Sequence, residues 1–240
     1  MHNETARIFL SLRWGLLDFS LTAPVLLNFL AAFILIVLLG LAARRLALRP
    51  SGILQSLLEY SVEFVEQQII VPTRLDAKVW TPLCLSLFLF ILVSGWLAAI
   101  PGFSAPTANI NTSATLAVLV FIIGLAARFY HNGFLGFFRS LIPAGINGPL
   151  ALILLPIEIL SQLCKPFSLA IRLFANMSGG HLLLVSILGF TAIFKNTLVS
   201  FFSSGGAVVI ILFELFVCVI QAYVFTFLSA LLIGESQSED

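Results

Sequence analysis

The stretch from Pro149 to Phe190, PLALILLPIEILSQLCKPFSLAIRLFANMSGGHLLLVSILGF, decides the fold class of this chain. It runs for 42 residues, whereas a straight helical crossing of a bilayer needs about 20. Two crossings would need a turn inside it, and the one candidate, SGG at 178–180, carries no charge that would mark a water-exposed turn. The stretch therefore predicts one long, steeply tilted membrane helix, with Pro156 and Pro166 as its kink positions.

The composition of the whole chain agrees with a membrane protein. Of its 240 residues, 60% are hydrophobic and only 10% are charged, whereas a soluble domain is about 25% charged. The net charge of +1 gives no basic face for nucleic acid. Cys84, Cys164 and Cys218 lie in apolar segments, so we interpret them as small core residues rather than a disulfide framework or a metal site. The first 22 residues lack the pattern of a signal peptide, and we expect no cofactor.

Four more apolar segments are long enough to cross a bilayer, and loops rich in Gly, Pro, Ser or aromatic residues separate them. With the segment at 149–190, the expected crossings are 23–43, 79–100, 112–130 and 207–233. We place a polar turn between 128 and 149 and a loop at 194–206. The predicted fold class is an all-α membrane protein with about five transmembrane helices, the last two long and tilted, in a single membrane domain over residues 1–240.

The segment 50–71, PSGILQSLLEYSVEFVEQQIIV, has a different pattern. At helical spacing, apolar side chains fall on one side and acidic ones on another; the apolar set is Leu54, Leu57, Leu58, Val62 and Val65, and the acidic set is Glu59, Glu63 and Glu66. This pattern predicts an amphipathic helix on the membrane surface, starting at Pro50 and Ser51. A soluble linker helix is the alternative.

The distribution of basic residues predicts the orientation, because they gather on the inner side of a membrane. Seven lie on one side, Arg44, Arg45, Arg49, Arg74, Lys78, Arg128 and Arg139, and three on the other, Arg7, Arg13 and Lys195. We therefore expect the N-terminus outside, the C-terminus inside and five crossings.

Polar residues inside the last two segments are the candidate functional residues, because ionisable groups in membrane helices face a bundle interior or a water path. Glu158, Lys165 and Arg172 are seven apart, so they form one stripe with steps of about 10 Å, and Asn176 lies one turn further on. Glu214 and Gln221 share a face of the last segment. In an antiparallel pair, Glu214 would lie near His181 in the outer half, and Gln221 near the height of Arg172.

Each of these residues also has a simpler interpretation. Lys165 can extend to the membrane surface beside Pro166, and His181 can be a satisfied core histidine. Glu158 and Glu214 can pair with Lys165 and His181. The combination favours function, because a guanidinium that stays charged separates carboxylates from a histidine that can change charge. This pattern predicts a proton path with a barrier at Arg172.

The run PFSLAIRLFANMSGGHLL, followed some thirty residues later by FELFVCVIQAYVF, resembles subunit a of the F-type ATP synthase. The stretches PGFSAPTANINTSATLAV, PSGILQSLLEYSVEFV and LIPAGINGPLALILLPIEILSQL are similar to the same family. The resemblance implies a non-catalytic, proton-translocating stator subunit of an enzyme complex. Implied partners are the rotor c-ring, a b-type peripheral stalk, other membrane-sector subunits and the bilayer.

The family's functional residues match positions of this chain. The essential arginine matches Arg172, and the polar residues near it match Asn176 and Gln221. The acidic residue of the inner half-channel matches Glu158, and the outer-channel pair matches His181 and Glu214. Where some bacterial members carry Asp in the loop, this chain has Asn109, which puts a carboxylate role there in doubt.

The order His181 then Glu214 resembles mitochondrial and alphaproteobacterial members. We therefore expect a multi-pass protein of the mitochondrial inner membrane, with the bacterial plasma membrane as the alternative. The alternative function is a secondary transporter with a buried charged site, which predicts internal repeats and helices broken at the site. We find no repeat in the sequence.

Overall fold

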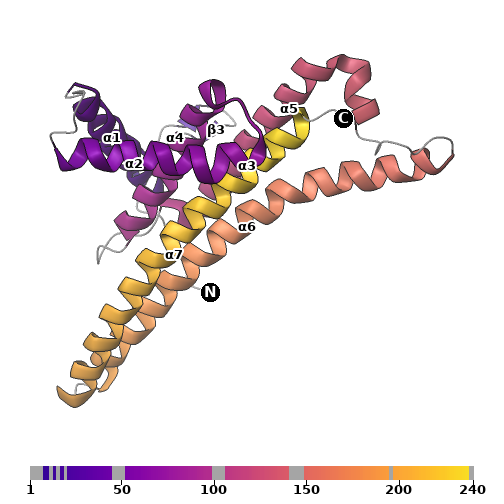
Figure 1. The fold of residues 1–240 in the computed structure, drawn as a ribbon. Coiled ribbons are helices and arrows are strands. Elements are labelled where there is room, and N and C mark those ends of the chain that lie inside the picture. The colour runs from indigo at the N-terminus through magenta and orange to yellow at the C-terminus, as the bar shows by residue number, and fades with distance from the viewer. Residues whose placement is uncertain are drawn as a thin grey trace.

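The computed structural model describes residues 8–10, 13–14, 17–18, 21–44, 52–98, 106–140, 149–194 and 197–237, and helices dominate it (Figure 1). Two antiparallel pairs of very short strands precede the first helix; they are β1 (Ile8–Leu10) with β4 (Leu21–Thr22), and β2 (Arg13–Trp14) with β3 (Leu17–Asp18). The helices that follow confirm the expected all-α membrane architecture.

Five helices make up the membrane part: α1 (Ala23–Arg44), α4 (Ala77–Ala98), α5 (Ile110–Ser140), α6 (Pro149–Phe194) and α7 (Thr197–Gln237). In the part of the chain that the structure describes, α4, α5, α6 and α7 are long and apolar enough to cross a bilayer, and α1 adds a shorter apolar stretch, Val25–Leu41. The segments expected at 23–43 and 79–100 correspond to α1 and α4, although residues 99 and 100 lie outside the described part.

A further run of helix joins α1 to α4. It consists of α2 (Ile53–Val65), the π-helix η1 (Glu66–Ile70) and α3 (Val71–Thr73). Gly52 stands before it in an extended conformation (φ −149°, ψ 151°), and Arg74 ends it in the left-handed region (φ 56°). The expected start at Pro50 and Ser51 lies outside the described residues.

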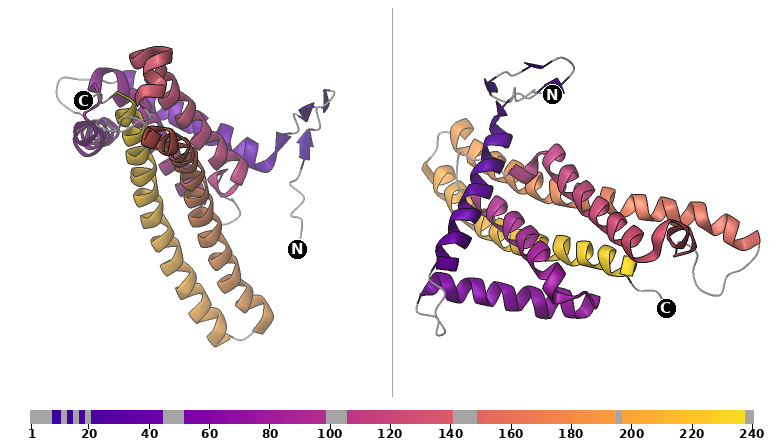
Figure 2. Two further views of the ribbon diagram at one scale, coloured as in Figure 1. Left: turned by 90° about the vertical axis from the view of Figure 1, so that its right-hand side faces the viewer. Right: turned by 90° about the horizontal axis from the view of Figure 1, so that it is seen from above.

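Helix α2 runs across the C-terminal end of α1 rather than along it (Figure 2). Ile53, Leu57 and Tyr60 are exposed, as are Glu59 and Glu63, so both the apolar and the acidic side chains of α2 are available to other groups. This arrangement suits a helix at a membrane surface, and the surface position itself stays a prediction.

The last two helices form a long antiparallel hairpin. α6 and α7 run side by side from the hairpin end and then diverge, with α6 bending away along its first half, which holds Pro156 and Pro166 (Figure 1). Figure 2 shows both helices slanting strongly relative to α1. The segment expected at 149–190 is a single helix, and SGG at 178–180 is helical within it.

The start of α7 corrects the expected loop at 194–206, because the helix begins at Thr197 and not near 207. The SSGG sequence has turn propensity, but a membrane strongly favours backbone groups that are hydrogen-bonded within a helix. Small side chains also let the two helices approach, which the packing at this end reflects. Ser203 is buried, and a Cβ added at Gly206 would lie 3.8 Å from Ile187 Cγ2 on α6.

Helix α5 also extends beyond the expected span of 112–130. It continues to Ser140, and its helical geometry is broken at Gly133, whose φ is +66° and ψ −179°. Glycine adopts a positive φ without the steric cost of a Cβ. Part of the turn expected between 128 and 149 is therefore helical on both sides of a kink at Gly133.

Close helix contacts at glycines hold the bundle together, as is usual for membrane helices. A Cβ added at Gly95 of α4 would lie 2.5 Å from Cys218 Sγ of α7. At Gly124 of α5 it would lie 2.5 Å from Leu232 Cδ2, also of α7. Near the C-terminal end of α7, a Cβ at Gly234 would lie 2.8 Å from the carbonyl oxygen of Thr73. Larger residues at these positions would separate α7 from its neighbours.

Candidate functional site

Helix α6 carries the predicted polar stripe on one continuous helix. Glu158 and Lys165 are half-buried, and Arg172 is exposed. At 1.5 Å per residue, about 21 Å of helix rise separates Glu158 from Arg172, and about 13 Å separates Arg172 from His181. The fixed cation therefore lies between an acid at one end of the stripe and a titratable imidazole toward the other.

Arg172 lines a cavity of about 390 Å³ where α5, α6 and α7 meet. Lys165, Ser161 and Ser168 of α6 also line it, together with Ser229 of α7 and apolar side chains of α5. Two cations and three hydroxyls give this cavity a polar wall inside an apolar bundle. Such a space can hold water, because it is both roomy and lined by hydrogen-bonding groups.

Asn176 and Gln221 join the two long helices at the height of Arg172. Asn176 Nδ2 donates a hydrogen bond of 2.8 Å to Gln221 Oε1. Asn176 lies one turn beyond Arg172 on α6, so this bond places Gln221 within about one helical turn of the arginine along the hairpin. The predicted proximity of Gln221 to the height of Arg172 is present in the structure.

Glu214 and His181 are also brought together, on the hairpin side of Arg172. The Glu214 side chain packs against Gly180, where an added Cβ would lie 2.8 Å from Glu214 Oε1. The imidazole of the next residue, His181, is close enough to act electrostatically on the Glu214 carboxyl group. Glu214 is only 5% exposed, and both of its carboxyl oxygens are buried with no hydrogen-bond partner among the described residues. A buried carboxyl group without such bonds needs a proton, a water molecule or another ligand to compensate for its lost hydration.

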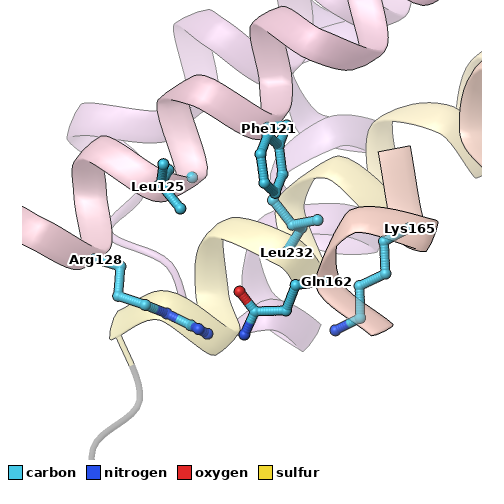
Figure 3. A pocket seen from close by; sticks show the side chains of 7 residues that line it. Phe121, Leu125, Arg128, Gln162, Lys165 and Leu232 are labelled. Carbon is cyan, nitrogen blue, oxygen red and sulfur yellow. The ribbon is translucent and has the colours of Figure 1, made fainter. Parts of the chain in front are cut away.

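Glu158 lies apart from these groups. Its contact is within α6, where Gln162 Nε2 approaches Glu158 Oε1 at 3.4 Å. Gln162 also lines a small pocket beside the large cavity, together with Lys165 of α6 and Arg128 of α5. The head groups of Arg128, Gln162 and Lys165 lie along one side of this pocket, with Phe121, Leu125 and Leu232 on the other (Figure 3).

Sequence reasoning placed Arg128 among the flanking basic residues, but its side chain is only 7% exposed. It lines the same pocket as Lys165, so this side of the site carries more positive charge than the pattern of α6 alone indicated. Its position directly after the apolar run of 112–127 could not distinguish a flanking arginine from one that folds back into the bundle.

Three further buried polar residues of the bundle were not singled out from the sequence. Asn28 of α1, Ser94 of α4 and Thr107 of the 3-10 helix η2 (Pro106–Ala108) each bury a side-chain oxygen with no hydrogen-bond partner in the described part of the chain. Gln221 Nε2 is likewise buried with no hydrogen-bond partner in the described part of the chain. Asn28 had a detectable signal, since it is the one polar side chain in the apolar run 23–43.

Asn109 has a structural role in this chain. Its Oδ1 accepts a hydrogen bond from the backbone N–H of Asn111 at 3.0 Å, and its carbonyl oxygen accepts from the N–H groups of Thr112 and Ser113. These bonds cap the start of α5. Cys84 and Cys218 are buried and Cys164 is exposed, all as free thiols.

The arrangement is a titratable pair toward the hairpin end, a fixed cation at the middle beside a polar cavity, and the Glu158 carboxyl group on the other side. The family model described as ATP synthase A chain matches residues 25–234, which contain all of these groups. The chain belongs to the ATP synthase A chain family.

Relatives in this family are similar over most of the chain. ATP synthase subunit a 2 of Chlorobaculum tepidum is 38% identical over 224 residues, covering 90% of this chain and 63% of the relative. ATP synthase subunit a of Anaeromyxobacter dehalogenans is 38% identical over 230 residues, covering 93% and 60%. The chain thus spans about three fifths of the length of these two curated relatives. Both come from bacteria, which gives the mitochondrial expectation no support.

Proposed function

We propose that this chain is the proton-translocating stator subunit in the membrane sector of an F-type ATP synthase. It would provide two offset half-channels to a rotor ring, separated by Arg172. The observation that carries the proposal is the position of Arg172, which is exposed on α6 one turn from the Asn176–Gln221 bond. The titratable pair and the polar cavity lie to either side of it along the hairpin.

On the outer side, a proton would pass His181 and Glu214 and neutralise a carboxyl group of the rotor. A neutral carboxyl group can turn into lipid at far lower cost than an ionised one. Both carboxyl oxygens of Glu214 are buried and have no hydrogen-bond partner among the described residues. This supports a role for Glu214 in holding or passing a proton or a water molecule.

On the inner side, the rotor carboxyl group would lose its proton into the cavity lined by Lys165 and Arg172 and toward Glu158. The anion that results is attracted to Arg172. Because a guanidinium does not give up its proton, Arg172 cannot pass protons directly between the two half-channels. A membrane potential contributes about 2.3 kcal/mol per charge per 100 mV, which would drive rotation in one direction.

The partners in this proposal are the rotor c-ring, a peripheral stalk and other membrane-sector subunits. The bacterial relatives favour the bacterial plasma membrane as its location. The unbroken course of α6 and α7 through the site speaks against the secondary transporter, because transporter sites are typically formed by discontinuous helices.

Replacement of Arg172 tests the proposal. In vesicles that contain the assembled complex, we expect Arg172→Ala to abolish ATP synthesis driven by an imposed proton gradient. The matched control is Ile171→Ala, which truncates a neighbouring side chain that is 42% exposed, and it should retain synthesis. A normal synthesis rate in Arg172→Ala would refute the proposed function.

A further inference from the structure

The small pocket between α5, α6 and α7 gathers two cations and an amide on one of its sides. Arg128 of α5 and Gln162 and Lys165 of α6 form this donor row (Figure 3). The pocket has a volume of about 10 Å³, which is the space for a single water-sized group. One oxygen atom of a larger ligand therefore fits into it, while the rest of that ligand would lie at its mouth.

Arg128 is the buried member of the donor row. Its side chain is only 7% exposed, and it takes part in a further interaction within the chain. Its Nη1 atom is buried and has no hydrogen-bond partner in the part of the chain that the structure describes. A buried guanidinium nitrogen gains from an acceptor that compensates for its lost hydration. Because a guanidinium stays charged, an anionic oxygen is the acceptor that suits it best.

The other two members of the donor row are half-buried, so the pocket is partly accessible from their side. Gln162 Nε2 approaches Glu158 Oε1 at 3.4 Å, which uses one N–H group of the amide and leaves the second. The ammonium group of Lys165 has three N–H groups to donate. Glu158 brings one negative charge near the pocket, against the two positive charges of Arg128 and Lys165. The balance of these charges favours an anionic ligand.

The pocket lies at the end of two apolar spans. These spans are Ile110–Tyr130 in α5 and Thr197–Gly234 in α7. Arg128 stands two residues before the end of the first span, and Leu232 stands two residues before the end of the second. The ends of membrane spans lie at the height of the lipid head groups. The distribution of basic residues predicts that this is the inner side of the membrane.

The wall opposite the donor row is apolar. Phe121 and Leu125 of α5 and Leu232 of α7 form it (Figure 3). A free, hydrated anion gains nothing from such a wall, because its own surface is entirely polar. A phospholipid has both parts, since its phosphate group is charged and its glycerol and acyl carbons are apolar. The two sides of the pocket therefore match a lipid better than a free anion.

We propose that this pocket binds the phosphate group of an anionic phospholipid from the inner leaflet. One phosphate oxygen would accept a hydrogen bond from Arg128 inside the pocket, and the others would accept from Gln162 and Lys165 at its mouth. Hydrogen bonds between a cation and a phosphate are about twice as strong as neutral ones. The inference goes beyond the proposed function and does not depend on proton translocation, because it requires only that the chain lies in a bilayer.

Labelling with a photoreactive phosphatidylglycerol tests the site in the assembled complex, purified in a neutral detergent. We expect the lipid to label α5 within residues 121–125. Arg128→Gln keeps a hydrogen-bonding side chain and removes the fixed charge, so at subsaturating lipid it should lower this labelling about tenfold, which corresponds to about 1.4 kcal/mol. The matched control is Lys78→Gln, which removes the same charge from an exposed side chain at the start of α4 and should leave labelling unchanged.

A second variant and two ligand controls complete the experiment. Gln162→Leu keeps the side-chain volume and every charge, and it should also lower labelling; it tests the site even if Arg128→Gln reduces the amount of assembled complex. A photoreactive phosphatidylcholine carries the same phosphate without a net charge, so it should label residues 121–125 several times less. Inorganic phosphate should not compete with the labelling, because it has no apolar part to contact the opposite wall.

Each contrary outcome overturns the inference. Equal labelling of the wild-type, Arg128→Gln and Gln162→Leu complexes would show that the donor row does not hold the lipid. Equal labelling by phosphatidylcholine would refute the anionic class, and loss of labelling in the presence of inorganic phosphate would assign the pocket to a free anion. The result is independent of the proposed function, because Arg172→Ala should keep the labelling whether or not it abolishes ATP synthesis.

Discussion

Replacing Gly180 by alanine should displace the Glu214 carboxyl group and slow proton entry without unfolding the protein. The added Cβ would lie 2.8 Å from Glu214 Oε1 and 3.0 Å from Cδ, whereas ordinary contacts begin at 3.4 Å. The difference, 3.4 − 2.8, means that the carboxyl oxygen must move by about 0.6 Å. A misplacement of about 1 Å can lower a rate about 100-fold, so we expect a reduction of about tenfold.

Stability should change little, because the obstructing atoms are the far end of a flexible side chain. A helical Gly→Ala substitution also contributes about 1 kcal/mol of stability, which offsets part of the cost of crowding. The effect should therefore be visible in proton conduction rather than in the amount of assembled complex.

The adjacent glycine provides a close control. A Cβ at Gly179 would meet nothing within 4 Å, so Gly179→Ala makes the same chemical change on the same turn of α6 without touching Glu214. ATP-driven proton pumping and passive conductance in vesicles, each normalised to assembled complex, are the assays. Equal conductance in Gly180→Ala and Gly179→Ala would refute the assigned role of the Glu214 position.

Three further predictions concern the interface of α6 and α7 and the contact of α7 with α4. Glu214→Gln should slow proton entry more than it reduces assembly, and a double exchange, His181→Glu with Glu214→His, should conduct better than either single change; no advantage in the double exchange would contradict a paired role. Gly95→Ala should lower the thermal stability of the complex, because overpacking at the 2.5 Å approach to Cys218 costs about 1–3 kcal/mol. Gly40→Ala serves as its control, because a Cβ at Gly40 would meet nothing within 4 Å. Equal melting temperatures of the Gly95→Ala and Gly40→Ala complexes would contradict the prediction, because they would mean that α4 and α7 can move apart without loss of stability.

The sequence was most informative where a membrane allows few alternative structures for a segment. A largely apolar run of 42 residues at 149–190 had to be either one slanted helix or two crossings with a turn, and the absence of charge at SGG favoured one helix. Spacing of seven residues placed Glu158, Lys165 and Arg172 on one stripe of α6. Antiparallel order then brought Asn176 to Gln221.

The sequence was least informative where tertiary packing decides. Turn propensity at SSGG suggested a loop, but α7 begins at Thr197 because packing against α6 and the lack of water favour helix there. Arg128 follows an apolar run as a flanking residue would, yet it is buried beside Lys165. No periodicity links Asn28 to Thr112, because their hydrogen bond joins residues 84 positions apart.

The close contact between Gly234 and the Thr73 carbonyl oxygen has a mechanical consequence. In the proposed function, a turning rotor that presses on α6 would push the hairpin of α6 and α7 sideways. The contacts between the hairpin and the other helices would then have to resist that force. At its C-terminal end α7 abuts α3, which is continuous with η1 and α2, so the load would pass into the helix that runs across the end of α1 (Figure 2). The α2–α3 unit would then act as the anchorage of the hairpin, and a bulkier residue at Gly234 would weaken the resistance of the stator to torque before it altered any step of proton transfer.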